Sequence, residues 1–243
     1  MNHCNKHYFN RTVVIGNWKL GISSMNIVAQ INSILAALIL LTAFGLLVQR
    51  RIYGLLHLFA WQGLFLSIST AVVGFVAGAH HLYISSVLTL ALKVILLPYI
   101  LHLLILRLQI RKEIDAVVNI PTTMLIGIAI VIFSYYLTAP VRELSTLMTR
   151  STLAVALATV MLGLLMMITR RHAVTQIIGF LAMENGLFFA ATSATYGMPL
   201  VVELGVALDI LIAAFIFGIF FFQIRTAFDS LDVDQMARLK EED

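Results

Sequence analysis

Long runs of apolar residues, separated by short polar segments, fill most of the sequence. Seven runs can be delimited, at residues 27–48, 53–79, 82–106, 117–137, 152–168, 175–195 and 200–224. Each is long enough, at 1.5 Å of helical rise per residue, to cross a bilayer core of about 30 Å. The runs lack the alternating polar positions of a membrane β-barrel, and lipid gives the backbone no hydrogen-bond partners. The predicted fold class is therefore an all-α integral membrane protein with seven transmembrane helices.

The composition excludes several classes of protein. The 243 residues are 60% hydrophobic and 12% charged, and the mean hydropathy is +0.97. Soluble domains carry about 25% charged residues, so a water-soluble globular domain is excluded. The single cysteine, Cys4, excludes a disulfide framework, a cysteine-rich zinc site and an iron–sulfur cluster held by this chain. We expect no cofactor and no metal, and we read the net charge of +4 as a signal of topology rather than of nucleic-acid binding.

The basic residues are distributed unevenly between the two predicted membrane faces. Ten lie after the first, third, fifth and seventh runs, and five lie on the other side. The ten are Arg50, Arg51, Arg107, Arg111, Lys112, Arg170, Arg171, Arg225, Arg238 and Lys240, and the five are Lys6, Arg11, Lys19, Arg142 and Arg150. The positive-inside rule places the ten in the cytoplasm. We therefore predict an N-terminus outside, a C-terminus in the cytoplasm, and a multi-pass protein of a bacterial inner membrane.

An internal repeat relates the first three runs to the last three. Residues 41–51 resemble residues 161–171, and both segments end in a pair of arginines. Gly-Leu-Phe at 63–65 matches 186–188, and residues 91–93 match 207–209. We interpret this as two parallel three-helix units joined by a fourth helix, whose Pro121 lies where a first turn tolerates proline. The alternative is that apolar helices resemble one another by composition alone.

The repeat suggests boundaries along the chain. An N-terminal tail covers 1–24, the first three-helix unit 25–112, the connecting helix 113–149, the second unit 150–226, and a cytoplasmic tail 227–243. The N-terminal tail has no apolar core of a signal peptide. Met25 directly precedes the first run, so both Met1 and Met25 are candidates for the true start.

Three ionisable residues fall inside predicted membrane helices at one depth. Lys93, Glu184 and Asp209 lie 14 to 16 residues from Arg107, Arg170 and Arg225 respectively, at the cytoplasmic ends of their helices. A charged residue at such a depth costs at least about 2.5–3.5 kcal/mol to insert. Three at matched depth favour ion pairing or a proton relay, and the alternative is a set of interhelical hydrogen bonds. The repeat makes Lys93 and Asp209 matching positions of opposite charge, so we expect them to be partners in the relay.

Four further residues are candidates, Glu203 for the proton relay and Asn185, Gln176 and Pro98 for supporting roles. Glu203, three residues into the last helix, is a candidate group for proton uptake or release near the outer surface, or an interfacial polar residue. Asn185 is placed to orient a water beside the glutamate, and Gln176 is a polar group nearer the cytoplasmic end. Pro98 has no N–H, so it frees the carbonyl of the residue four positions earlier and opens the backbone beside Lys93, unless it is an ordinary kink.

These residues also carry a resemblance to a known family. Met-Glu-Asn-Gly at 183–186, Val-Glu-Leu-Gly-Val-Ala-Leu-Asp at 202–209, and Lys-Val-Ile-Leu-Leu-Pro at 93–98 resemble hydrogenase-4 component E, as does Leu-Asp-Val-Asp at 231–234. The resemblance covers residues 25–240. The last three helices of that family are similar to subunit K of respiratory complex I and to the small C subunit of multisubunit sodium/proton antiporters.

The resemblance implies a place in a larger assembly. It implies antiporter-like membrane subunits as partners, and a peripheral [NiFe] hydrogenase or another redox arm reached through the complex. The glutamates that subunit K uses in proton movement carry over to Glu184 on the sixth helix, and to Asp209 or its rival Glu203 on the seventh.

We therefore expect a non-catalytic, proton-conducting subunit that links proton sites laterally between antiporter-like subunits. The alternatives are a subunit of a cation/proton antiporter or other proton-coupled complex without hydrogenase, and a structural spacer subunit. The sequence leaves open the redox partner, the direction of pumping, and the choice between protons and sodium.

Overall fold

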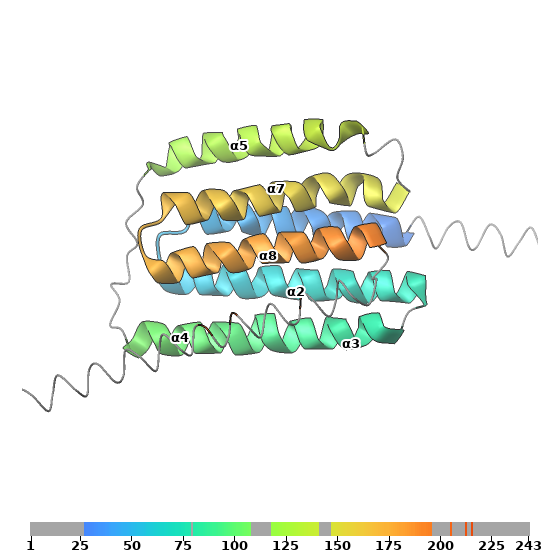
Figure 1. The fold of residues 1–243 in the computed structure, drawn as a ribbon, viewed down its shortest axis with the longest axis horizontal. Helices are drawn as coiled ribbons and strands as arrows, with labels where there is room; N and C mark the ends of the chain where they lie inside the picture. The colour runs from blue at the N-terminus through green and yellow to red at the C-terminus, as the bar shows by residue number, and fades with distance from the viewer. Residues whose placement is uncertain are drawn as a thin grey trace, which may run out of the picture.

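A computed structural model describes residues 27–78, 80–107, 118–140 and 147–195, together with the single positions 205, 212 and 215. A first helix, Ile27–Val48, is followed by helices that we label as in Figure 1. They are α2 (Ile52–Ala77), α3 (His80–Thr89), the π-helical segment η1 (Leu90–Leu96), α4 (Leu97–Arg107), α5 (Ile120–Leu137), α7 (Leu147–Thr169) and α8 (Ala173–Thr195). Helices α3, η1 and α4 form one continuous span.

Six helices in this described part of the chain are long and apolar enough to cross a membrane. They lie side by side along the long axis of the molecule (Figure 1). Helix α2 lies between α8 and the α3–η1–α4 span, α7 packs along α8, and α5 packs on the other side of α7. Helix Ile27–Val48, drawn in blue, lies behind α7 and α8 in this view and contributes to the same core.

The observed helices agree with the first six predicted runs within a few residues. The fifth begins at Leu147 rather than at 152, and the fourth begins at Ile120 rather than at 117, with Pro121 in its first turn as predicted. The one departure in type is η1, a π-helical segment inside the run predicted as a simple helix. The seventh predicted helix, the two tails and the domain boundaries that depend on them lie largely or entirely outside the described residues.

The hairpin between α2 and α3 fixes the position of the third span. Gly78 ends α2 in the left-handed conformation, with φ of 62°, and its N–H donates to the carbonyl of Gly74. This conformation is readily open only to glycine, which makes it a common end for a helix. The turn lets α3 return directly along α2, so that residues of the two helices meet in the middle of the bundle.

The opposite ends of the helices meet around Arg170. Arg170, shortly before α8, donates through its side chain to the carbonyls of Leu47 and Gln49, which shortly precede α2 in the chain. The ring of Tyr53 in α2 also lies 5.5 Å from that of His102 in α4. Helices α2 and α8 therefore begin at the same end of the bundle, which we call the Arg170 end, and α4 finishes there. The α2–α3 turn marks the other end, which we call the Gly78 end.

Candidate functional site

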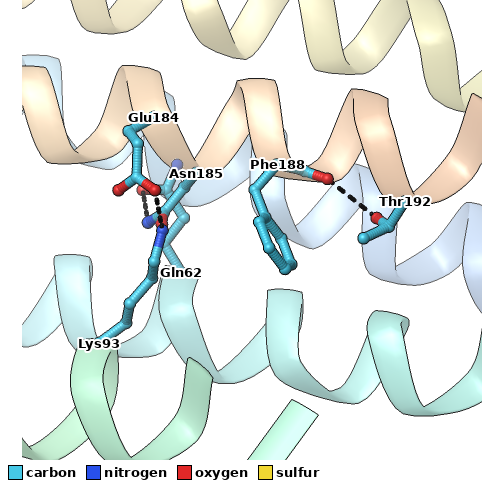
Figure 2. Close-up of polar contacts among 6 residues, drawn as sticks. All are labelled: Gln62, Lys93, Glu184, Asn185, Phe188 and Thr192. Carbon is cyan, nitrogen blue, oxygen red and sulfur yellow. Dashed lines mark hydrogen bonds and ion pairs between the residues drawn. The ribbon is translucent and has the colours of Figure 1, made fainter. Parts of the chain in front are cut away.

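A buried ion pair lies in the middle of the bundle. The Nζ atom of Lys93 in η1 lies 2.8 Å from Oε1 of Glu184 in α8, and the two side chains are 0% and 5% exposed. Figure 2 shows the lysine extending from its own span toward the carboxylate. Residues expected at one depth are thus in direct contact, although 91 positions separate them in the sequence.

Two amides extend the pair across a third helix. The Lys93 Nζ donates to Oδ1 of Asn185 at 2.9 Å, and Nδ2 of Asn185 donates to Oε1 of Gln62 in α2 at 3.2 Å (Figure 2). Asn185 and Gln62 are both 0% exposed. One connected polar cluster, which we call the Lys93 cluster, therefore joins Gln62, Lys93, Glu184 and Asn185.

The charges in the Lys93 cluster compensate each other. A lysine or a glutamate alone at this depth is costly, but the pair is neutral overall, and its opposite charges attract each other at a distance of 2.8 Å. The ring centroid of Phe188, one turn along α8, lies 5.5 Å from the Lys93 Nζ, so its π face also faces the cation. Removing one member of a buried pair leaves an uncompensated charge and costs about 3–5 kcal/mol.

The backbone around Lys93 departs from the α-helix. Lys93 lies inside η1, and the N–H of Leu97 donates to the carbonyl of Leu92, five residues earlier. Pro98 follows directly, in the first turn of α4, and supplies no N–H of its own. Short π-helical segments inside α-helices occur frequently at functional sites, because the wider turn redirects side chains. A widened turn thus lies beside Lys93, and the carbonyl that Pro98 is expected to free stays a prediction.

Two polar atoms of the Lys93 cluster have neither a hydrogen-bond partner nor an ion-pair partner among the described residues. They are Oε2 of Glu184 and Nε2 of Gln62, and both are buried. An unpartnered carboxylate oxygen is a site at which a proton or a water molecule can bind without displacing the ion pair at Oε1. The cluster thus combines a fixed charge pair with a free acceptor and a free donor.

The other candidate residues lie outside this cluster. Gln176, in the first turn of α8, donates through Nε2 to the carbonyl of Arg170 at 3.0 Å, so it holds the α7–α8 connection at the Arg170 end. Asp209 and Glu203 lie outside the described residues, and the expected pairing of Lys93 with Asp209 lies outside them too. Sequence reasoning missed Gln62, although the repeat contains a signal: Gln62 precedes Gly63 as Asn185 precedes Gly186.

A second polar centre lies at the Arg170 end. Nη2 of Arg170 donates to the carbonyls of Leu47 and Gln49, each at 2.8 Å, at the C-terminal end of helix Ile27–Val48. Burial, and then the nearby Arg50, lower the pKa of Arg170 from its ordinary value. An arginine stays charged in proteins, and a cation at a helix C-terminus is favourable, so Arg170 acts as a buried cap between two helices.

Within the ranges that the structure describes, no group of three or more His, Cys, Asp or Glu side chains is arranged to hold a metal ion. The Lys93 cluster brings together one carboxylate, one ammonium group and two amides. The carboxylate can take up and release a proton. The ammonium can pair with the carboxylate or separate from it, and the two amides can orient these two charged groups.

Comparison with known proteins finds relatives along most of the chain. The uncharacterized protein Rv0085 of Mycobacterium tuberculosis is 32% identical over 204 residues, which cover 83% of this chain and 93% of the relative. Hydrogenase-4 component E of Escherichia coli K12 is 28% identical over 214 residues, covering 85% of this chain and 95% of the relative, and the protein of that name from Shigella flexneri gives the same values. No family model matches the chain, and no solved structure matches it.

Proposed function

We propose that this chain, which belongs to the hydrogenase-4 component E family, is a membrane subunit of a hydrogenase-like complex that passes protons through the Lys93 cluster. The family assignment supports membership in a multisubunit complex, since the relatives from Escherichia coli, at 28% identity, are named as a component of hydrogenase-4. The observation that carries the proton role is the buried contact of 2.8 Å between Lys93 and Glu184.

The contact supports a relay because it can exist in two states. A proton that binds Oε2 of Glu184 neutralises the carboxylate and weakens its attraction for the Lys93 ammonium. The ammonium is then held by Asn185 and by the face of Phe188, and a neighbouring acid can take the place of Glu184 as its partner. When Glu184 releases the proton, the ion pair with Lys93 forms again, and no net charge remains on the two residues.

The relay needs further groups that receive the proton. We assign this role to Asp209 and Glu203, with Asp209 as the relay partner of Lys93 and Glu203 as an exchange group near the outer surface. Asn185 and Gln62 orient the charged groups. Pro98 supports the backbone of the span that carries Lys93, and Gln176 supports the start of the helix that carries Glu184. The partners on this proposal are antiporter-like membrane subunits in a bacterial inner membrane, with a redox arm attached through the complex.

Replacing the acid tests the proposal. We expect Glu184→Gln to lower proton translocation by the assembled complex at least about tenfold, because glutamine keeps the size and hydrogen bonding of glutamate but does not take up protons at working pH. Translocation is measured by quenching of a pH-sensitive dye in membrane vesicles, normalised to the complex seen on native gels. Glu184→Asp should retain more activity, since the carboxylate is only about one methylene shorter.

A buried polar residue away from the cluster supplies the control. Ser134 in α5 is fully buried, and its hydroxyl has no hydrogen-bond partner among the described residues, so Ser134→Ala removes a polar group of the membrane interior without touching the Lys93 cluster. It should translocate protons as the parent protein does. Normal translocation by Glu184→Gln at normal abundance would reject the relay and leave the structural spacer as the better description.

A further inference from the structure

The buried residues on the two sides of the Lys93 cluster differ in chemistry. Seven residues are about two turns of an α-helix, so positions seven residues from Gln62 in α2 and from Asn185 in α8 lie on the same faces of those helices, and positions seven residues from Lys93 lie at comparable distances along its own span. Toward the Gly78 end the residues are Ser69, Ser86 and Thr192, and toward the Arg170 end they are Leu55, Ile100 and Ile178.

All six of these side chains are buried, so the difference does not reflect exposure to lipid. The three hydroxyl residues are 0%, 7% and 1% exposed, and the three aliphatic residues are 0%, 3% and 0% exposed. At these three pairs of positions, the residue toward Gly78 carries a hydroxyl and the residue toward Arg170 carries an alkyl group, although buried apolar residues such as Leu66, Val73 and Leu82 also lie toward the Gly78 end.

The hydroxyls toward the Gly78 end form contacts between helices. Ser67 and Ser86 exchange hydrogen bonds, each donating to the carbonyl of the other at 2.8 Å, with their Oγ atoms 3.1 Å apart. Ser69 donates to Oδ1 of Asn32 in the first helix. Ser85 is 2% exposed, and its Oγ has no partner among the described residues. This half of the interior thus contains hydrogen-bonding groups on several helices, including an unpartnered one.

The half toward the Arg170 end is filled differently. Its core consists of tightly packed aliphatic and aromatic side chains from α2, α4 and α8. They include Leu55, Phe59, Leu97, Leu101, Leu104, Ile178 and Leu181, each of which is 2% exposed or less. A proton or a water molecule finds no hydrogen-bonding side chain among these residues, and an ion in such surroundings is strongly disfavoured.

We propose that water and protons reach the Lys93 cluster from the Gly78 end only, along the hydroxyls, and that the apolar core toward the Arg170 end is a seal. The inference rests on the proposed function and adds a direction to it. Each hydroxyl both donates and accepts, so a reorienting row of hydroxyls and water can pass a proton without a net charge resting on any side chain. The unpartnered Nε2 of Gln62 and Oε2 of Glu184 would be the first groups that this water meets.

Phe188 occupies the boundary between the cluster and the hydroxyl half. Figure 2 shows its ring on the same side of α8 as Asn185, between the Lys93 cluster and Thr192. The ring faces the ammonium at 5.5 Å, and the hydroxyl of Thr192 donates to the Phe188 carbonyl at 3.0 Å. A path from the Gly78 end therefore passes this ring before it reaches Lys93.

Cysteine substitution with a matched control tests the direction of access. Ser86 and Ile100 each lie seven residues from Lys93 along the same span, in opposite directions and both buried. In a Cys4→Ser background, Ser86→Cys and Ile100→Cys are exposed to a charged, membrane-impermeant methanethiosulfonate on each side of vesicles that contain the assembled complex. Thiolates form only where water reaches the sulfur, so the reaction rate reports hydration.

We expect Ser86→Cys to react at least about tenfold faster than Ile100→Cys, and only with reagent on the side of the α2–α3 turn. Thr192→Cys and Ile178→Cys, each seven residues from Asn185 on α8, form a second pair. Thr192→Cys should likewise react faster than Ile178→Cys, so the test stands even if one variant of the first pair fails to assemble. Equal rates within both pairs, or faster reaction at the aliphatic positions, would overturn the proposal. The hydroxyls would then serve only as hydrogen bonds between helices.

The labelling result and the proposed function can fail separately. Labelling measures water in the protein, whereas the Glu184→Gln experiment measures proton translocation. One-sided labelling together with normal translocation by Glu184→Gln would retain the hydrated path and reject the relay. Loss of translocation without one-sided labelling would retain the relay and reject this path.

Discussion

Lys93 reaches Glu184 because its own span lies close against α2 at Gly63. A methyl group added at Gly63 would lie 3.1 Å from Cβ of Lys93, and 3.5 Å from its carbonyl carbon and oxygen. Such a contact is tighter than Cβ atoms normally make, so the π-helical segment would have to move outward by a few tenths of an ångström. Gly63 therefore helps to set the position from which the lysine extends.

Gly63→Ala should impair proton translocation more than it impairs assembly. A small displacement of Lys93 lengthens its contacts with Glu184 and Asn185, and misplacing reacting groups reduces rates steeply, so we expect a loss of at least about threefold. The control is Gly45→Ala, where the added methyl would lie 3.2 Å from Cδ1 of Leu58, the end of a flexible side chain that can move aside. Equal translocation by the two variants would show that Gly63 does not set the geometry of the site.

The sequence located most of the Lys93 cluster because charge inside a membrane is conspicuous. Lys93 and Glu184 were found by their insertion cost, and Asn185 by its position next to the acid. Gln62 was missed because a neutral amide costs less and is common at helix interfaces, so nothing but its place in the repeat distinguishes it. The roles of Asp209 and Glu203 stay predictions, because both residues lie outside the described part of the chain.

At the scale of elements, Pro98 predicted a local opening but not its form. A missing N–H indicates that the backbone before the proline must change its hydrogen bonds. It does not determine whether the helix kinks or widens, since that depends on what packs against it. Here the neighbour is α2 at Gly63, and the structure shows a seven-residue π-helical segment. The lengths and approximate ends of the helices were predictable from the apolar runs, since lipid offers the backbone no hydrogen-bond partners and such a run must therefore form a helix.

Arg170 makes a testable contribution at the ends of the helices. Arg170→Ala removes the donor from the carbonyl of buried Leu47, which costs about 1–3 kcal/mol for an unsatisfied group, and also from the half-buried Gln49. We expect a lower midpoint of thermal unfolding in detergent, measured by tryptophan fluorescence or by thiol exposure at an engineered cysteine.

Arg171→Ala is the matched control for this substitution, because Arg171 is exposed and adjacent. It removes the same charge from the same connection, but no interaction between helices, and should change the midpoint little. If the two variants unfold at the same temperature, the hydrogen bonds of Arg170 contribute nothing measurable to the packing of α7 and α8 against the first helix.

At the scale of the whole molecule, contacts occur between positions that the internal repeat matches. Gln62 and Asn185 are matched residues, and they are hydrogen-bonded to each other at 3.2 Å. Helices α2 and α8, which carry them, begin at the same end and lie in contact (Figure 1). A duplicated unit places its equivalent helices together only after folding, so the sequence could match these residues but not predict that they touch. The arrangement of complete three-helix units involves residues beyond those described.

The orientation of the molecule in the membrane decides which compartment supplies the hydroxyl path. The ten-to-five distribution of basic residues predicts that the Arg170 end faces the cytoplasm. The Gly78 end would then face the outside, and protons would reach the Lys93 cluster from there. The packed apolar core would separate the cluster from the cytoplasm, so any onward transfer would run sideways to Asp209 or to a neighbouring subunit.

Single cysteines at the two predicted faces test this orientation. In a Cys4→Ser background, His80→Cys at the start of α3 should react with an impermeant maleimide added to intact spheroplasts, because the α2–α3 turn is predicted outside. Arg111→Cys, after α4, should react only after the membrane is opened with mild detergent. The two sites flank one membrane span in the chain, so they should lie on opposite faces of the membrane, and each serves as the control for the other. The reverse pattern would invert the topology, and the hydroxyl path would then open to the cytoplasm while the geometry of the Lys93 cluster stayed as it is.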